Sequence, residues 1–229
     1  MKIKQINHLA FITKDMEKTI RFYRDLLAME LEVGMGIDGY RHYFFKTADN
    51  YIAFFQYEEA RPMEIKPHGE PTDQPLGFDH VAFTVESKQD LFHLKDKLEA
   101  AGLEVRGPID HGLMWSIYFF DNNNIPLEAC WDCIEVTQFP AVWDDEPMDI
   151  VSEGSGPQLN VWPKVTQPTP PDKMIAEAGG GFTMREYFLK QGWAIKKPDF
   201  DSKIISDSCG KEEVHLKDNQ IKETNRCFR

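Results

Sequence analysis

An internal repeat constrains the fold more than any other feature of this sequence. The segment Asn7-His8-Leu9-Ala10-Phe11 returns 72 residues later as Asp79-His80-Val81-Ala82-Phe83. In each copy the apolar side chains alternate as they do in a strand, and then recur at the spacing of a helix. A repeat of this length indicates that the chain builds one supersecondary unit twice.

Each copy predicts a strand, an amphipathic helix and three further strands. The first helix is expected over Met16–Ala28, with Asp15 as its N-cap. The second helix is expected to start after Ser87 and to end before Gly102, which suits a left-handed C-terminal cap.

The sequence therefore predicts an α+β fold with two tandem βαβββ modules, residues 1–70 and 71–139, forming a cupped mixed sheet around a metal site. Residues 140–229 are predicted to be an irregular, Pro-rich extension with one short helix, Thr183–Gln191, which Thr183 and Glu186 would cap. We expect this extension to wrap the body or a partner subunit and to cap the cup.

Three side chains are candidate metal ligands. Strand alternation turns His8 and His80 away from the helices, at equivalent points of the two modules, and the last strand of the second module adds Glu128 on the same side. Two imidazoles and one carboxylate form the triad of non-haem Fe(II) enzymes. A carboxylate within a sheet also needs a partner, which a divalent cation supplies.

These residues, together with the run His111-Gly112-Leu113-Met114-Trp115-Ser116-Ile117-Tyr118-Phe119-Phe120-Asp121, resemble the vicinal oxygen chelate superfamily over residues 3–135. The resemblance implies a divalent metal on His8, His80 and Glu128, with Fe(II) favoured and Mn(II), Ni(II) or Zn(II) as alternatives. It implies that His111 and Tyr118 act on a small-molecule substrate in a homodimer. The run is similar to the extradiol dioxygenase signature, so an Fe(II) dioxygenase is the favoured function.

One departure from the extradiol pattern leaves other functions open. The last strand of the first module carries no acid–base His, and either Phe54 or Gln56 stands opposite Glu128; the turn favours Phe54. Gln56 as a fourth ligand would favour a redox-free glyoxalase or epimerase. A fosfomycin-resistance-type thiol transferase is the related alternative, and a drug-sequestering binding protein is the third hypothesis.

Composition limits the partners. The net charge of −12, with no basic cluster, argues against nucleic acid and anionic membranes. No apolar run approaches 18 residues, and four Cys are too few for a disulfide scaffold. We therefore expect a reduced, cytoplasmic protein. Cys130 and Cys133 fall on opposite strand faces, so we do not expect them to share a zinc ion.

Overall fold

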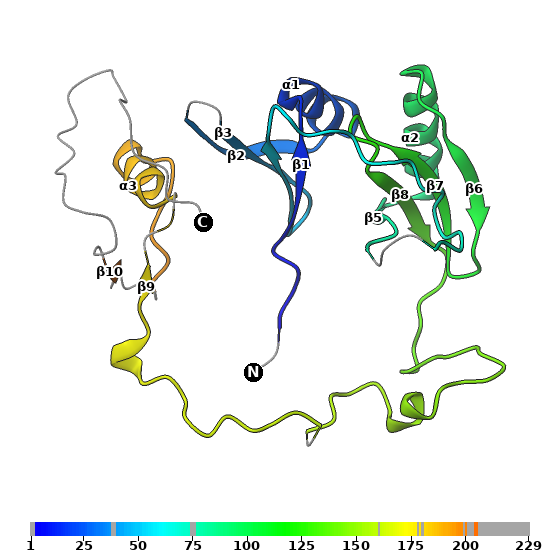
Figure 1. Ribbon diagram of the computed structural model, residues 1–229. Helices are drawn as coiled ribbons and strands as arrows, with labels where there is room; N and C mark the ends of the chain where they lie inside the picture. The colour runs from blue at the N-terminus through cyan, green and yellow to red at the C-terminus, as the bar shows by residue number, and fades with distance from the viewer. Residues whose placement is uncertain are drawn as a thin grey trace. The chain divides into compact units, whose positions relative to one another are not determined.

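The computed structural model describes residues 3–37, 40–73, 77–159, 161–177, 179, 181–198, 200 and 204–205. The chain divides into two compact units, Met1–Val161 and Trp162–Arg229, and each is described by itself. The first unit contains both copies of the repeat as separate four-stranded sheets (Figure 1). The predicted pair of βαβββ modules is confirmed, whereas the boundaries at residues 70 and 139 stay a prediction.

Each module pairs its first strand with its last strand in parallel. The first sheet has the order β1-β4-β3-β2 and the second the order β5-β8-β7-β6, so β1 and β5 are edge strands. The first sheet consists of β1 (His8–Thr13), β2 (Glu30–Ile37), β3 (Tyr40–Lys46) and β4 (Tyr51–Gln56). The second consists of β5 (Val81–Thr84), β6 (Arg106–Asp110), β7 (Met114–Phe120) and β8 (Pro126–Asp132).

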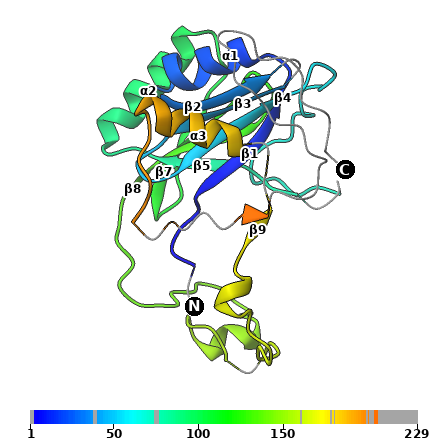
Figure 2. The same cartoon turned by 90° about the vertical axis from the view of Figure 1, so that its left-hand side faces the viewer.

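The helices begin where the sequence predicts. Asp15 accepts a hydrogen bond from the Lys18 amide at 3.0 Å and caps α1 (Met16–Ile20), which continues as the π-helical turn η1 (Arg21–Leu26). Ser87 accepts from the Asp90 amide at 3.1 Å and caps α2 (Lys88–Ala100). Gly102 follows α2 with φ +81°, as expected for a left-handed cap. Both helices lie over the strands in Figure 2.

The two modules share one hydrophobic core on the helix-covered side of the sheets. Phe22 and Tyr23 of the first helix belong to the same buried cluster as Phe119 and Leu127 of the second sheet. Phe22 and Phe119 have ring centroids 6.5 Å apart. This shared core joins both copies of the repeat into one folding unit.

A buried turn between β7 and β8 locks the modules together. Asp121 accepts hydrogen bonds from the amides of Asn123 (2.7 Å) and Ile125 (2.8 Å), and Tyr23 of the first module donates its hydroxyl to the same carboxylate at 3.1 Å. Thr13 of β1 also donates to the Asn123 side chain at 2.8 Å. Burial raises the pKa of Asp121, while the amides of Ile125 and Asn123 oppose the shift.

The C-terminal unit contains α3 (Phe182–Gln191), which confirms the predicted helix, but its cap differs from the prediction. Thr183 lies inside the helix and Gly181 occupies the N-cap, with no side-chain capping bond. Tyr187 and Phe188 pack against Trp193 just after the helix, with ring centroids 5.5 and 5.7 Å apart.

The remaining elements of the C-terminal half are short. They are η2 (Asp149–Glu153), η3 (Pro171–Lys173), β9 (Ala176–Glu177) and β10 (Ile204–Ile205). Within the described parts of the chain, no helix has the length and apolar character needed to cross a bilayer.

We expect Tyr23→Phe to lower the free energy of unfolding by about 1–3 kcal/mol, because the buried Asp121 carboxylate loses a donor without losing packing. Urea denaturation followed by circular dichroism measures this change. The exposed Tyr187 provides the matched control, Tyr187→Phe, which should leave the midpoint within error. Equal midpoints for the two variants would contradict the role given to Tyr23.

Candidate metal centre

His80 and Glu128 meet on the face of the second sheet that the helices do not cover. The Ala82↔Glu128 register of β5 and β8 brings the carboxylate beside the start of β5, where His80 Nε2 lies 2.6 Å from Glu128 Oε2. Glu128 is only 4% exposed. A carboxylate buried to this extent requires a proton donor or a cation as partner.

Asp79 orients the His80 ring through Nδ1, the ring nitrogen that does not face Glu128. Its carboxylate accepts from His80 Nδ1 at 2.6 Å and from the Gly69 amide at 2.9 Å, and it forms an ion pair with Lys66. The hydrogen bond from Lys66, followed by that from His80, holds the pKa of Asp79 well below its usual range. The ionised carboxylate accepts a hydrogen bond from Nδ1 and so turns Nε2 toward Glu128.

The same arrangement recurs at His8, because the residue before it plays the part of Asp79. Asn7 Oδ1 lies 2.8 Å from His8 Nδ1 and accepts a hydrogen bond from it, which leaves Nε2 as the nitrogen that can bind a metal ion. His8 itself is exposed on edge strand β1. Both histidines therefore present the nitrogen that a metal ion would bind, each oriented by the side chain that precedes it.

The structure does not bring the three predicted ligands together within one chain. Among the described residues, no three His, Cys, Asp or Glu side chains lie close enough to share a metal ion. Because the two sheets are separate and β1 does not pair with β5, His8 remains apart from His80 and Glu128. The donors present, two oriented imidazoles and one buried carboxylate, nevertheless fit a divalent cation.

His111 and Tyr118, predicted to act on the substrate, lie beside this pair. Tyr118 stands opposite Glu128 in the β7–β8 register, and its hydroxyl lies 2.9 Å from His111 Nε2. Burial, followed by the charge of Glu128, raises the pKa of Tyr118. The tyrosine therefore keeps its hydroxyl proton at neutral pH and shares a hydrogen bond with the His111 ring.

His68 also lies beside this pair, and the sequence analysis did not identify it as a site residue. Its ring centroid lies 4.9 Å from that of Tyr118, 4.8 Å from Phe120 and 5.9 Å from His80. Burial lowers the pKa of His68, and the charge of His80 lowers it further, which favours the neutral ring. Asp79 and Lys66 were missed altogether, although Asp79 occupies the same repeat position as Asn7.

The strand register identifies a different residue of the first module as the equivalent of Glu128 from the one predicted. Ala10 pairs with Ala53, whereas Ala82, its repeat equivalent, pairs with Glu128. Ala53 therefore holds the position equivalent to Glu128, and the preference for Phe54 was wrong. Phe54 is fully buried in the core on the opposite face. Gln56 also faces the helix side, so neither residue supplies a fourth ligand.

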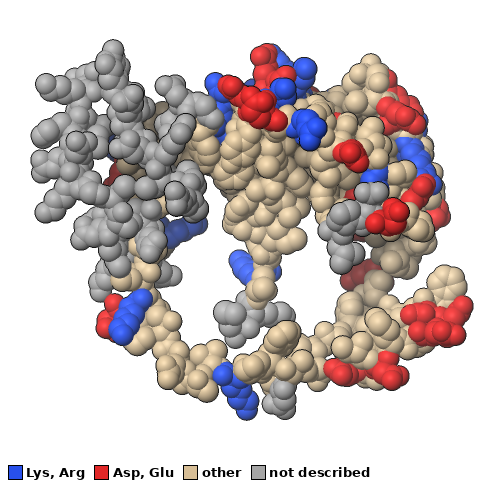
Figure 3. Space-filling view, viewed as in Figure 1, with Lys and Arg blue, Asp and Glu red and all other residues tan. Residues whose placement is uncertain are grey.

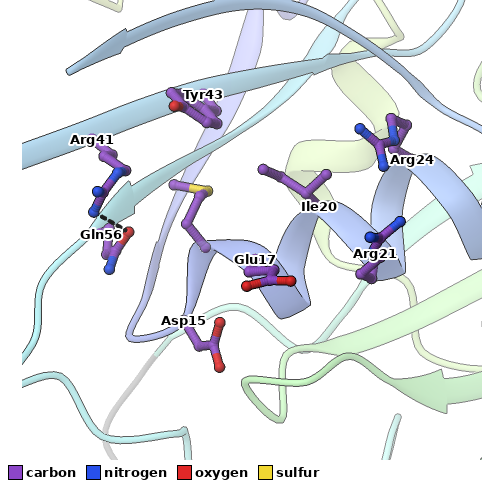
Figure 4. Close-up of a pocket in the computed structure, with 9 residues that line it drawn as sticks. Asp15, Glu17, Ile20, Arg21, Arg24, Arg41, Tyr43 and Gln56 are labelled. Atoms are coloured by element: carbon purple, nitrogen blue, oxygen red, sulfur yellow. Dashed lines mark hydrogen bonds between the residues drawn. The ribbon is translucent and has the colours of Figure 1, made fainter.

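A hollow of about 530 Å³ lies on the helix-covered side of the first sheet, away from the metal ligands (Figure 4). Its lining includes Arg41 and Gln56, which are joined by a hydrogen bond of 3.2 Å. The β3–β4 pair Arg41↔Gln56 corresponds to the β7–β8 pair Trp115↔Trp131. The rest of the lining contains both acidic and basic side chains, so the hollow favours no one class of ligand.

Comparison with known proteins identifies the family. The sequence model of the Glyoxalase/Bleomycin resistance protein/Dioxygenase superfamily matches residues 5–129, more than half of the chain. The chain belongs to this superfamily. This result confirms the resemblance that the paired modules and the repeated histidines indicated, and the match covers both modules.

Individual relatives within the superfamily are distant. The glutathione transferase FosA of Serratia marcescens is 28% identical over 127 residues, which are 55% of this chain and 79% of that protein. A glyoxylase/bleomycin resistance protein/dioxygenase domain from Frankia sp. EAN1pec is 23% identical, with TM-score 0.48, covering 57% of this chain and 93% of that one. The fosfomycin resistance protein FosX of Listeria monocytogenes, complexed with Mn(II) and sulfate, is 22% identical, with TM-score 0.44, covering 58% and 96%.

We expect Asp79→Asn to weaken binding of Mn(II) by about 10–100-fold, because the substitution removes the charge that fixes His80 without removing a donor to the ion. Isothermal titration calorimetry of the purified full chain measures the affinity. Asp96→Asn, on the exposed side of α2, is the matched control and should bind as the wild type does. Unchanged affinity in Asp79→Asn would show that this carboxylate does not support a metal ligand.

Proposed function

We propose that the protein is a metal-dependent enzyme whose small-molecule substrate chelates the ion through two adjacent oxygens. The observation that carries the proposal is the buried Glu128 carboxylate 2.6 Å from His80 Nε2. A buried carboxylate this close to a ring nitrogen needs a positive charge that both atoms share. A divalent cation supplies that charge.

We further propose that His8 completes the ligand set from a second copy of the chain. His8 lies on edge strand β1, which pairs with β4 on one side only; its apolar side chains Leu9 and Ile12 are exposed, as is Ile6 just before it. An exposed apolar edge strand favours pairing with another strand. In the second module, β5 is likewise an edge strand, and it begins next to His80. Pairing β1 of one copy with β5 of another would bring His8 to the other two ligands and form a homodimer.

When bound, the ion would polarise the substrate oxygens and stabilise negative charge that develops on them. Proton transfer to and from the substrate would be carried out by Tyr118 and His111. The Tyr118 hydroxyl and His111 Nε2 share a hydrogen bond of 2.9 Å, so the pair can deliver a proton to, or accept one from, an oxygen beside Glu128. The His68 ring lies against the Tyr118 ring on this side of the site.

Two reactions fit these residues. The first is the Fe(II) extradiol-type dioxygenation predicted from the sequence, for which His111 and Tyr118 are the acid–base groups. The second is a redox-free reaction, an isomerisation, an epimerisation or a thiol transfer, which the 28% identity to a glutathione transferase favours. A drug-sequestering protein would not need the oriented Nε2 atoms, so it is the third possibility.

The two-chain site can be tested by mixing variants. His8→Ala and Glu128→Ala chains, each purified, should bind no Mn(II) tightly when alone. After unfolding and refolding together at equal amounts, half of the dimers contain both chains, and each mixed dimer regains one intact ligand set. We therefore expect about a quarter of the wild-type sites to return.

Two control mixtures accompany this experiment. Refolding each variant with itself should restore nothing, and refolding His80→Ala with Glu128→Ala should also fail, because these ligands lie on the same module. Recovery in the second control, or no recovery in the first mixture of well-folded dimers, would refute the assignment of His8 to a second chain.

The identity of the native metal separates the two reactions. We expect about one divalent metal ion per chain in protein purified without oxygen, and none in His80→Ala. Iron in elemental analysis would support the dioxygenase. Manganese, nickel or zinc at the same stoichiometry would select the redox-free reaction, because these ions act there as Lewis acids. Wild-type protein without metal would contradict both and leave the sequestering function.

A further inference from the structure

The face of the first sheet that the helices do not cover is lined with aromatic rings. Alternate residues of β3 and β4 place His42, Phe44 and Phe55 on it, on the same side of the sheet as His8. His42 stacks on Phe55 with centroids 3.6 Å apart and an angle of 13° between the ring planes. The His42 and Phe44 centroids are 4.3 Å apart, and Tyr57 stacks beyond Phe55 at 6.4 Å.

Residues at equivalent positions of the two modules differ in chemistry on this face. The pair Phe44↔Ala53 of β3 and β4 is equivalent to the pair Tyr118↔Glu128 of β7 and β8. By the same register, His42↔Phe55 corresponds to Ser116↔Cys130. The second module therefore carries a carboxylate and a phenol where the first carries a methyl group and a phenyl ring.

The aromatic face offers little to an anion. His42 is 7% exposed, and burial, followed by the charge of His8, lowers its pKa, which favours the neutral ring. On the uncovered side of β3 and β4 the one cation, Lys46, is paired with Glu32 at 3.3 Å. Arg41 points to the opposite face. Figure 3 shows charged side chains gathered over α1, with mostly uncharged residues over the strands below.

This face is continuous with the candidate metal ligand of the first module. The His8 and Phe44 rings lie 5.7 Å apart in an edge-to-face contact. A molecule chelated by an ion on His8 would therefore lie beside Phe44, and Phe55 and His42 are the next rings along the same face. Phe44 and Phe55 are partly exposed, and such rings stabilise a bound ring by stacking and by exclusion of water, whereas the buried His42 supports Phe55 by stacking on it.

We propose that the aromatic face formed by His42, Phe44 and Phe55 binds a planar, uncharged ring carried by the substrate next to its chelating oxygens. The proposal rests on the metal-dependent function proposed above, and it names the substrate class that this site selects. A compact phosphonate or other small anion without a ring would leave the aromatic face unused.

Two hydroxamates test the proposal without knowledge of the substrate. Acetohydroxamate and benzohydroxamate chelate a metal through the same pair of oxygens and differ in a methyl group against a phenyl ring. We expect the Mn(II)-loaded wild-type protein to bind benzohydroxamate at least about tenfold more tightly. In Phe44→Leu and Phe55→Leu, which keep apolar volume but remove a ring, this preference should fall about three- to tenfold.

The controls separate failure of the ring site from failure of the metal site. Phe92→Leu, on the partly exposed surface of α2, should keep the wild-type preference. Glu128→Ala should lose both hydroxamates together with Mn(II). A preference that is absent in the wild type, or unchanged in both Leu variants while Mn(II) still binds, would overturn the aromatic ring site alone. Failure of Mn(II) to bind the wild type would overturn the metal-dependent function and this proposal with it.

Discussion

The buried carboxylate of Asp121 is the interaction on which the arrangement of the two modules depends. It closes its own turn through two backbone amides and takes a hydrogen bond from Tyr23 of the other module. Because the turn follows β7 and precedes β8, the same bonds that join the modules also fix the strands that carry Tyr118 and Glu128. A polar group this deeply buried, fully satisfied by donors, specifies one packing arrangement rather than several.

The orientation of the candidate ligands follows from a simple rule applied twice. Asn7 and Asp79 each hold the Nδ1 proton of the histidine that follows, so strand geometry and one preceding side chain determine which nitrogen is free. The two histidines differ in their surroundings. His80 has a buried carboxylate beside it, whereas His8 lies on an exposed strand edge with aromatic neighbours. In the proposed site, the carboxylate ligand thus belongs to the second module and the aromatic contact with the rest of the substrate belongs to the first.

The sequence predicted what depends on local periodicity. Asp15 and Ser87 cap the helices as expected, and Asn124 adopts a positive φ of 61° in the turn after Asp121. The meeting of His80 with Glu128 also follows from alternation on neighbouring strands. Placing Phe54 opposite Glu128 failed because the two modules have turns of different geometry, which shifts the register by one residue. The separation of His8 from the pair depends on which strand edges meet, and alternation carries no information about that.

The replacement of Glu128 by Ala53 at the equivalent position has a consequence for how such a protein can change. A duplicated unit starts with two identical halves, and a site that needs a carboxylate from only one half leaves the other half free to vary. Substitutions on β3 and β4 can then alter what is recognised while the residues on β5, β7 and β8 stay constant. To redirect the proposed site to a new molecule, strands β3 and β4 of the first module are the place to diversify, whereas His8 and the second module should be kept.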